Sequence, residues 1–282
     1  MAALVCLLTA CNIATADEQD PVDIDANYPP GMLESSFISH GAKLNALHYT
    51  ANGAGPHPTV LLLHGYPGNE KNLDLAQHFR RHGWNVYFFH YRGAWGSEGS
   101  FTFVNAAEDV EAALDFLRNS GPEYRVDPEH IAIVGHSMGG AMTLAGASVD
   151  ARVQCAITLA AAPIKMISED EAAMAEFQAY SDGLIMLRDH DGSNVLEQDN
   201  AFGLAYPMNE VTAGLKGKKV FLIAAEHDQA VPLEVLESYA ALFSADPDIS
   251  VTTQVYPDDH SFSVHRITLA TRITEWLDAN CR

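Results

Sequence analysis

Cysteine is scarce in this 282-residue sequence, which contains four. Cys6 and Cys11 lie within the first eleven residues, so Cys155 and Cys281 alone remain in the body of the chain. Two cysteines cannot form the multi-bridge framework of small secreted domains, and whether they pair cannot be decided from the sequence. Cys155 lies in the apolar run VQCAITLA, where a buried thiol is expected.

Positive charge is also scarce: 16 lysines and arginines face 37 aspartates and glutamates, for a formal net charge of −21. Such a field repels phosphate backbones and anionic membrane surfaces, so we expect no nucleic-acid partner. The sequence has no Walker loop and no G-x-G-x-x-G after a predicted strand, and we therefore expect no cofactor. With 48% hydrophobic and 19% charged residues, the composition is that of a globular protein with a packed core.

The first sixteen residues are apolar, but they are too few to span a bilayer as a helix. They give way to the acidic stretch DEQDPVDID, which predicts an export signal at 1–16 and an acidic leader at 17–32. Two processing routes fit. LTAC resembles a lipobox, in which a lipidated Cys11 would anchor the protein to a membrane, whereas Ala14-Thr15-Ala16 fits ordinary signal cleavage. We expect an exported protein that is periplasmic, membrane-anchored or secreted.

Short apolar runs alternate with helical patterns from residue 33 to residue 282. The runs at 59–65, 131–137 and 219–225 are typical of buried parallel strands, and Val104 to Leu117 has the periodicity of an amphipathic helix. This alternation predicts one α/β domain with a mostly parallel, eight-stranded sheet and helices on both faces. Residues 163–217 interrupt it and are predicted to form a small helical lid after the sixth strand.

One motif lies directly between a predicted strand and a predicted helix. Gly135-His136-Ser137-Met138-Gly139 fits the G-x-S-x-G nucleophile elbow. The glycines suit a turn too tight for larger side chains, and the strain of the turn lifts the serine hydroxyl above the sheet edge. The motif predicts that Ser137 is a nucleophile.

A serine nucleophile needs a histidine base and a carboxylate that orients the histidine. In chain order the acid and then the histidine follow the serine. Asp228 follows the strand predicted at 219–225, and His260 follows the next strand, so both fall at the carboxyl edge of the sheet. We therefore predict Asp228 as the acid and His260 as the base. Glu226 and Asp258 are alternative acids, and His265, within the predicted final helix, is an alternative base.

A second glycine-containing segment, HGYPG at 64–68, ends the strand predicted at 59–65. The tetrahedral intermediate of acyl transfer needs two backbone donors. The amide of Met138, directly after the nucleophile, is expected to supply one donor, and the amide of Tyr66 the other. We expect His64 to brace this loop and not to act as a catalyst.

The motifs HGYPG, GHSMGG, HDQAVP and DDHSF together resemble the α/β-hydrolase superfamily, from about residue 33 to the end of the chain. Within it, HYRGAWGSEGSF and DDHSF are most similar to the bacterial esterase and dipeptidyl-aminopeptidase-like branch related to prolyl oligopeptidases. The resemblance implies the α/β-hydrolase fold and a serine hydrolase. The sequence lacks the β-propeller domain of the true oligopeptidases, which speaks against a peptidase.

The favoured hypothesis is a hydrolase that cleaves a small-molecule carboxylic ester through an acyl-enzyme. The same triad could instead cleave an amide, a small peptide or a thioester, and a third hypothesis is a noncatalytic binding protein of this fold. Trp95 and two residues of the predicted lid, Met174 and Phe177, are the candidate substrate-binding residues. His78 and His82 are four residues apart on a predicted helix but have no third ligand, so no metal site is expected.

Overall fold

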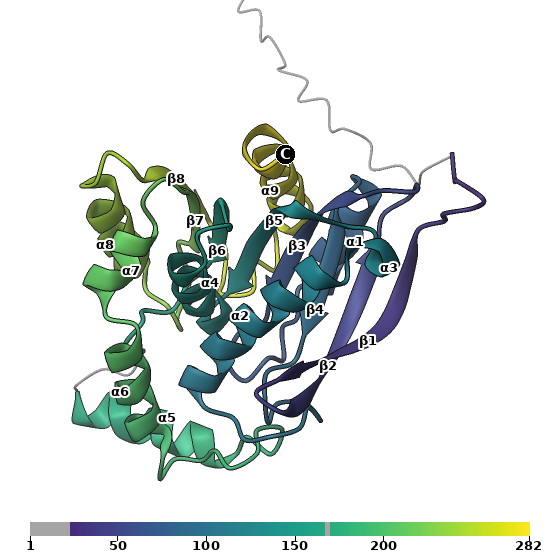
Figure 1. The fold of residues 1–282 in the computed structure, drawn as a ribbon. Coiled ribbons are helices and arrows are strands. Elements are labelled where there is room, and N and C mark those ends of the chain that lie inside the picture. Colours follow the sequence, from purple (N-terminus) through teal and green to yellow (C-terminus); the bar gives the residue numbers. More distant parts are fainter. Residues whose placement is uncertain (1–22, 167–169) are drawn as a thin grey trace, which may run out of the picture.

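The computed structural model describes residues 23–166 and 170–282, which fold around one eight-stranded sheet (Figure 1). The strands are β1 (Gly31–Ser39), β2 (Ala42–Thr50), β3 (His57–Leu63), β4 (Asn85–Phe89), β5 (Val126–His136), β6 (Cys155–Leu159), β7 (Lys219–Ala225) and β8 (Ser250–Tyr256). Their order is β1-β2-β4-β3-β5-β6-β7-β8. Antiparallel β2 pairs with β1 and β4, and the pairs from β4 to β8 are parallel. The predicted sheet is thus confirmed.

Helices cover both faces of the sheet (Figure 1). In chain order the helices are α1 (Leu73–Arg81), α2 (Phe103–Asn119), α3 (Gly121–Tyr124), α4 (Met138–Val149), α5 (Glu171–Asp182), α6 (Val195–Ala205), α7 (Met208–Gly214), α8 (Leu233–Ser244) and α9 (Arg266–Asn280). Side chains of α2, α4 and α8 belong to the hydrophobic core on one face, and those of α1 and α9 to the core on the other.

The central strand β3 shows why the sheet is buried on both sides. Leu61 and Leu63 enter the core beneath α2 and α4, whereas Val60 and Leu62 enter the core beneath α1 and α9. All four side chains are at most 1% exposed. Because neighbouring side chains of a strand point to opposite faces, a continuous apolar run is needed here. The parallel strands bring their carboxyl ends, and the loops that follow them, to the same edge.

The predicted helical insertion lies between β6 and β7 and comprises α5, α6 and α7. Its last helix packs on α4, since a β-carbon added to Gly214 would lie 2.0 Å from the Ser148 carbonyl oxygen. The domain begins earlier than expected, because β1 starts at Gly31 and not at residue 33. The prediction of His265 within the last helix was also wrong, since His265 is the N-cap residue of α9. The predicted export signal lies outside the described residues.

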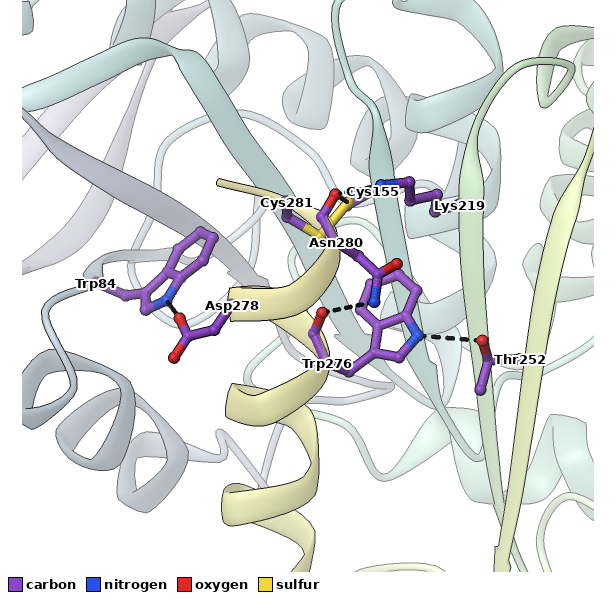
Figure 2. The surroundings of a disulfide bond; sticks show 8 residues. All are labelled: Trp84, Cys155, Lys219, Thr252, Trp276, Asp278, Asn280 and Cys281. Carbon is purple, nitrogen blue, oxygen red and sulfur yellow. Dashed lines mark hydrogen bonds between the residues drawn. A yellow bond between two sulfur atoms is a disulfide. The ribbon is translucent and has the colours of Figure 1, made fainter.

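A disulfide joins Cys155, the first residue of β6, to Cys281, just beyond α9 (Figure 2). The sequence left this pairing open. The bond connects residues 126 positions apart and fixes the end of the chain to the sheet. Within residues 23–166 and 170–282, no helix is long and apolar enough to cross a membrane.

Candidate active site

Ser137 occupies the sharp turn between β5 and α4. Its backbone has φ 57° and ψ −123°, a region that non-glycine residues rarely adopt and that marks functional strain. Both glycines of the motif are required because a side chain at either position would clash with the backbone. A β-carbon on Gly135 would lie 2.0 Å from the Gly139 carbonyl oxygen, and one on Gly139 would lie 2.5 Å from the Leu63 carbonyl oxygen. The turn is held in place because the Ser137 amide donates to the carbonyl of Leu159 over 2.8 Å.

The structure brings Asp228 and His260 together from the loops after β7 and β8. His260 Nδ1 lies 2.6 Å from Asp228 Oδ2, and the two side chains are 25% and 1% exposed, respectively. Asp228 Oδ1 accepts hydrogen bonds of 2.8 Å from the amides of Ala230 and Val231. Burial alone would raise the pKa of Asp228, but the hydrogen bond from His260 and those from the two amides outweigh it and hold the pKa below its ordinary value. Asp228 is therefore ionised at neutral pH and can orient the imidazole.

His136, the residue before Ser137, connects the His260 loop to the turn that carries Ser137. Its Nε2 donates to the carbonyl of His260 over 2.8 Å, and the two ring centroids are 4.6 Å apart. Burial, with the nearby His260, lowers the pKa of His136 to about 3, so its ring is neutral. This contact sets the partly exposed His260 imidazole beside the turn that carries Ser137. The sequence analysis did not single out His136.

The alternative acids and base lie elsewhere. Asp258 Oδ2 is 2.9 Å from His265 Nδ1 and accepts a hydrogen bond from the His265 amide, so this pair braces the loop of His260. Glu226 is exposed. Asp228 is thus the acid whose carboxylate contacts the His260 ring.

The loop after β3 approaches Ser137 from the other side. A β-carbon on Gly65 would lie 2.9 Å from that of Ser137. In the part of the chain that the structure describes, the amides of Tyr66 and Met138 donate to no other backbone or side-chain group. Met138 is the first residue of α4, where unpaired N–H groups and the helix dipole favour negative charge. These two amides are therefore available to donate hydrogen bonds to a ligand bound next to Ser137.

Two histidines, buried His64 and half-buried His90, support this loop. His64 Nδ1 donates to the Gly65 carbonyl over 2.8 Å, and His90 Nδ1 lies 3.2 Å from His64 Nε2. Burial lowers the pKa of His64 to about 4 and that of His90 to about 3, so both are neutral at pH 7. Because His64 Nδ1 carries its proton, His64 Nε2 accepts from His90. No sequence pattern indicated His90, which directly follows β4.

The three predicted substrate-binding residues have different surroundings. Trp95 Nε1 donates to the Pro67 carbonyl over 2.7 Å, and Phe177 stacks on Tyr66 with ring centroids 5.5 Å apart and planes at 17°. Met174 is partly buried against the main core. Trp95 and Phe177 thus both contact the loop at 64–68.

No group of three or more His, Cys, Asp or Glu side chains among the described residues could hold a metal ion. The rings of His78 and His82 stack with centroids 4.2 Å apart, and His82 Nδ1 donates to the His78 carbonyl.

Comparison with known proteins places this geometry in a family. The quorum-quenching protein AidA of Acinetobacter baumannii is 28% identical over 138 residues, which are 47% of this chain and 44% of AidA, so the match spans under half of that relative. Among solved structures, DcsB with its substrate analogue superposes with a TM-score of 0.69 at 18% identity, over 89% of this chain and 99% of DcsB. An esterase of Pyrococcus furiosus gives 0.65 at 20% identity, over 91% of this chain and 93% of the esterase.

The likeness to these two structures establishes the fold alone. The sequence model of the alpha/beta hydrolase fold family matches residues 58–214, which include the elbow and the loop at 64–68. On this match, the chain belongs to the alpha/beta hydrolase fold family.

Proposed function

We propose that the protein is a serine hydrolase that cleaves carboxylic esters of small molecules. The observation that carries this proposal is the 2.6 Å contact between His260 Nδ1 and buried Asp228, in a loop attached to the strained turn of Ser137. The proposal also draws support from the esterase among the structural neighbours. A noncatalytic binding protein would need neither the strained serine nor the oriented histidine.

The reaction would proceed in two steps. Ser137 Oγ attacks the ester carbonyl carbon while His260 Nε2 takes its proton, and the imidazolium that forms is stabilised by Asp228. The amides of Tyr66 and Met138 hold the oxyanion of the tetrahedral intermediate. His260 then protonates the leaving alcohol, and the C–O bond breaks to give the acyl-enzyme. Water, deprotonated by His260, attacks the acyl-enzyme and releases the acid and free Ser137.

A fluorophosphonate probe tests the nucleophile directly. The wild type should be labelled at Ser137, and Ser137→Ala should lose both labelling and the hydrolysis of p-nitrophenyl acetate. The variant should unfold at the wild-type temperature, because the hydroxyl adds little to packing. Near-wild-type turnover by Ser137→Ala would refute the proposal.

A substrate panel separates the reaction classes that share this machinery. p-Nitrophenyl esters of graded acyl length should be turned over faster than aminoacyl anilides and thioesters under the same conditions. A preference for anilides or thioesters would assign the site to amide or thioester hydrolysis. The absence of both labelling and turnover would favour a binding protein.

We further propose that the protein is exported. The apolar residues 1–16 motivate this proposal, and the Cys155–Cys281 disulfide supports it because disulfides persist in oxidising compartments. Fractionation of the native host tests it, with mass spectrometry of the mature N-terminus. A diacylglyceryl group on Cys11 would indicate the lipoprotein route, and cleavage after Ala16 the ordinary one. Intact chains that begin at Met1 in the cytoplasm would overturn the proposal.

A further inference from the structure

The backbone and the side chain of Tyr66 contact different parts of the protein. Its backbone belongs to the loop beside Ser137, whereas its side chain reaches the insertion after β6. The phenol oxygen lies 2.6 Å from His190 Nε2 and 2.8 Å from Ser181 Oγ. Both partners are buried, at 6% and 1% exposure. With the stacking of Phe177, the Tyr66 side chain is thus embedded in the insertion.

The neighbours of His190 fix the direction of its hydrogen bond to Tyr66. Gln198 Nε2 donates to Asn194 Oδ1 over 3.0 Å, so Gln198 Oε1 faces His190 Nδ1 at 2.7 Å and accepts its proton. The other ring nitrogen, Nε2, then has a free lone pair that accepts from the Tyr66 hydroxyl. Burial lowers the pKa of His190, which favours this neutral form.

The segment just before His190 is attached to the body of the protein. The Arg188 amide donates to the Gly93 carbonyl over 2.8 Å, and the Phe101 amide donates to the Arg188 carbonyl over 2.9 Å. The Trp95 amide donates to the Met186 carbonyl over 3.0 Å. His190 therefore follows a stretch that is bonded to the loop at 93–101, and it can act as a fixed point for the Tyr66 side chain.

We propose that His190 is a positioning residue that, through the Tyr66 hydroxyl, fixes the backbone amide of Tyr66 as an oxyanion donor. The inference rests on the proposed function. His190 anchors the hydroxyl at the end of the Tyr66 side chain. Because the side chain and the backbone amide belong to the same residue, this anchor limits how far the amide can rotate. An interaction of this kind matters most in the transition state, where the charge on the oxygen develops. Its loss should therefore lower kcat more than it changes KM.

The test compares His190→Leu with His190→Gln, whose side-chain amide oxygen can reach the position of Nε2 and accept from Tyr66. With p-nitrophenyl acetate, His190→Leu should lower kcat about tenfold, less than the 10²–10³ for complete removal of an oxyanion donor, and should leave KM within about twofold. His190→Gln should restore most of the loss. Equal kcat in the wild type and His190→Leu would overturn the proposal, and so would a change confined to KM.

A double-mutant cycle separates positioning through Tyr66 from a direct contact of either side chain with substrate. Tyr66→Phe removes the hydroxyl alone, keeps the ring stacked on Phe177, and should reproduce the loss in His190→Leu. The double variant should be no slower than either single variant, because both remove the same bond. Additive losses would contradict the proposal. Tyr66→Phe also keeps the test decisive if His190→Leu unfolds.

Tyr206→Phe is a matched control. Tyr206 lies in the same insertion, but its hydroxyl donates to Glu111 of α2 over 3.4 Å. It should leave kcat unchanged. Fluorophosphonate labelling of Ser137 distinguishes the two proposals. If the wild type is not labelled and does not hydrolyse the ester, the proposed function fails. If it does both and His190→Leu matches it, the positioning role alone fails.

Discussion

Gly65 and Ser137 lie in contact at the point where the two loops with the unpaired amides meet. A β-carbon on Gly65 would lie 2.9 Å from the Ser137 β-carbon and 3.2 Å from the His136 carbonyl oxygen. The first distance is shorter than real β-carbon contacts and the second is shorter than most of them, so a larger residue at position 65 would have to displace one of the two loops. The close approach of Ser137 thus requires glycine at position 65.

Gly65→Ala should lower kcat/KM by about 100-fold, because a displacement of about 1 Å between nucleophile and oxyanion donors costs this much. The expected loss is in kcat, measured with p-nitrophenyl acetate. Gly203→Ala in α6 is the control, since its added carbon would meet Lys165 at an ordinary 3.9 Å and alanine favours the helix. Wild-type activity in Gly65→Ala would mean that this loop does not hold the oxyanion.

The sequence was most informative where function depends on local backbone. The elbow follows from glycine spacing between a buried strand and a helix, and the positions of Asp228 and His260 follow from their place after successive strands. Contacts between side chains distant in the sequence carry no such signal. The bonds from Tyr66 to His190 and from His64 to His90 join residues 124 and 26 positions apart, through the packing of separate loops. Pairing of Cys155 with Cys281 likewise depends on where α9 ends against β6.

Replacement of Asp228 by Asn should lower kcat by about 10⁴-fold, because the amide no longer stabilises the charged imidazole and favours the wrong tautomer. Glu226→Gln, which makes the same chemical change on an exposed neighbour, should leave kcat unchanged. Initial rates with the best ester, at saturating concentration, measure both effects. If Glu226→Gln were the damaging change, the acid would be misassigned.

The shifted pKa of Asp228 predicts that the stability of the folded protein depends on pH. The pKa of Asp228 is lower in the folded protein than its ordinary value of 3.8, so its carboxylate contributes stability above that pH. This contribution is lost as the pH falls through the lower, folded-state pKa. The difference in unfolding free energy between wild type and Asp228→Asn should therefore become smaller as the pH falls below about 4. Urea unfolding at several pH values measures it, and a difference that stays flat down to pH 2 would contradict the shifted pKa.

His90→Phe should destabilise the loop at 64–68, because it leaves the buried His64 Nε2 without its donor, at a cost of about 1–3 kcal/mol. The phenyl ring can keep the stacking on Trp95, now at 5.9 Å between centroids and 27° between planes. His90→Asn is the matched variant, since its side-chain N–H can occupy the position of Nδ1. We expect lower kcat and lower thermal stability in His90→Phe, with most of both retained in His90→Asn. Equal behaviour of the two variants would show that the donor is unimportant.

The Cys155–Cys281 disulfide is expected to stabilise the fold without affecting catalysis. It lies at the start of β6, whereas Leu159, which bonds the Ser137 amide, lies at the other end of this five-residue strand, about 13 Å away. Noncovalent contacts also hold the end of α9: Trp276 Nε1 donates to Thr252 Oγ1 over 3.1 Å, and Lys219 Nζ donates to the Asn280 carbonyl over 2.7 Å (Figure 2). The reduced chain should therefore still fold.

Cross-linking residues 126 positions apart lowers the entropy of the unfolded chain, which predicts about 4–5 kcal/mol of stabilisation. The double variant Cys155→Ala, Cys281→Ala and the reduced wild type should thus unfold roughly 10 °C below the oxidised protein, while their kcat at 25 °C stays within about twofold. Thermal unfolding with and without a phosphine reductant provides the measurement, and the double variant, which should not respond to the reductant, is its control. A reductant that left the melting temperature of the wild type unchanged would mean that the bond adds no stability. A large loss of kcat at 25 °C would instead show that the C-terminal end of α9 is coupled to the His260 loop, which precedes the N-terminal end of this helix.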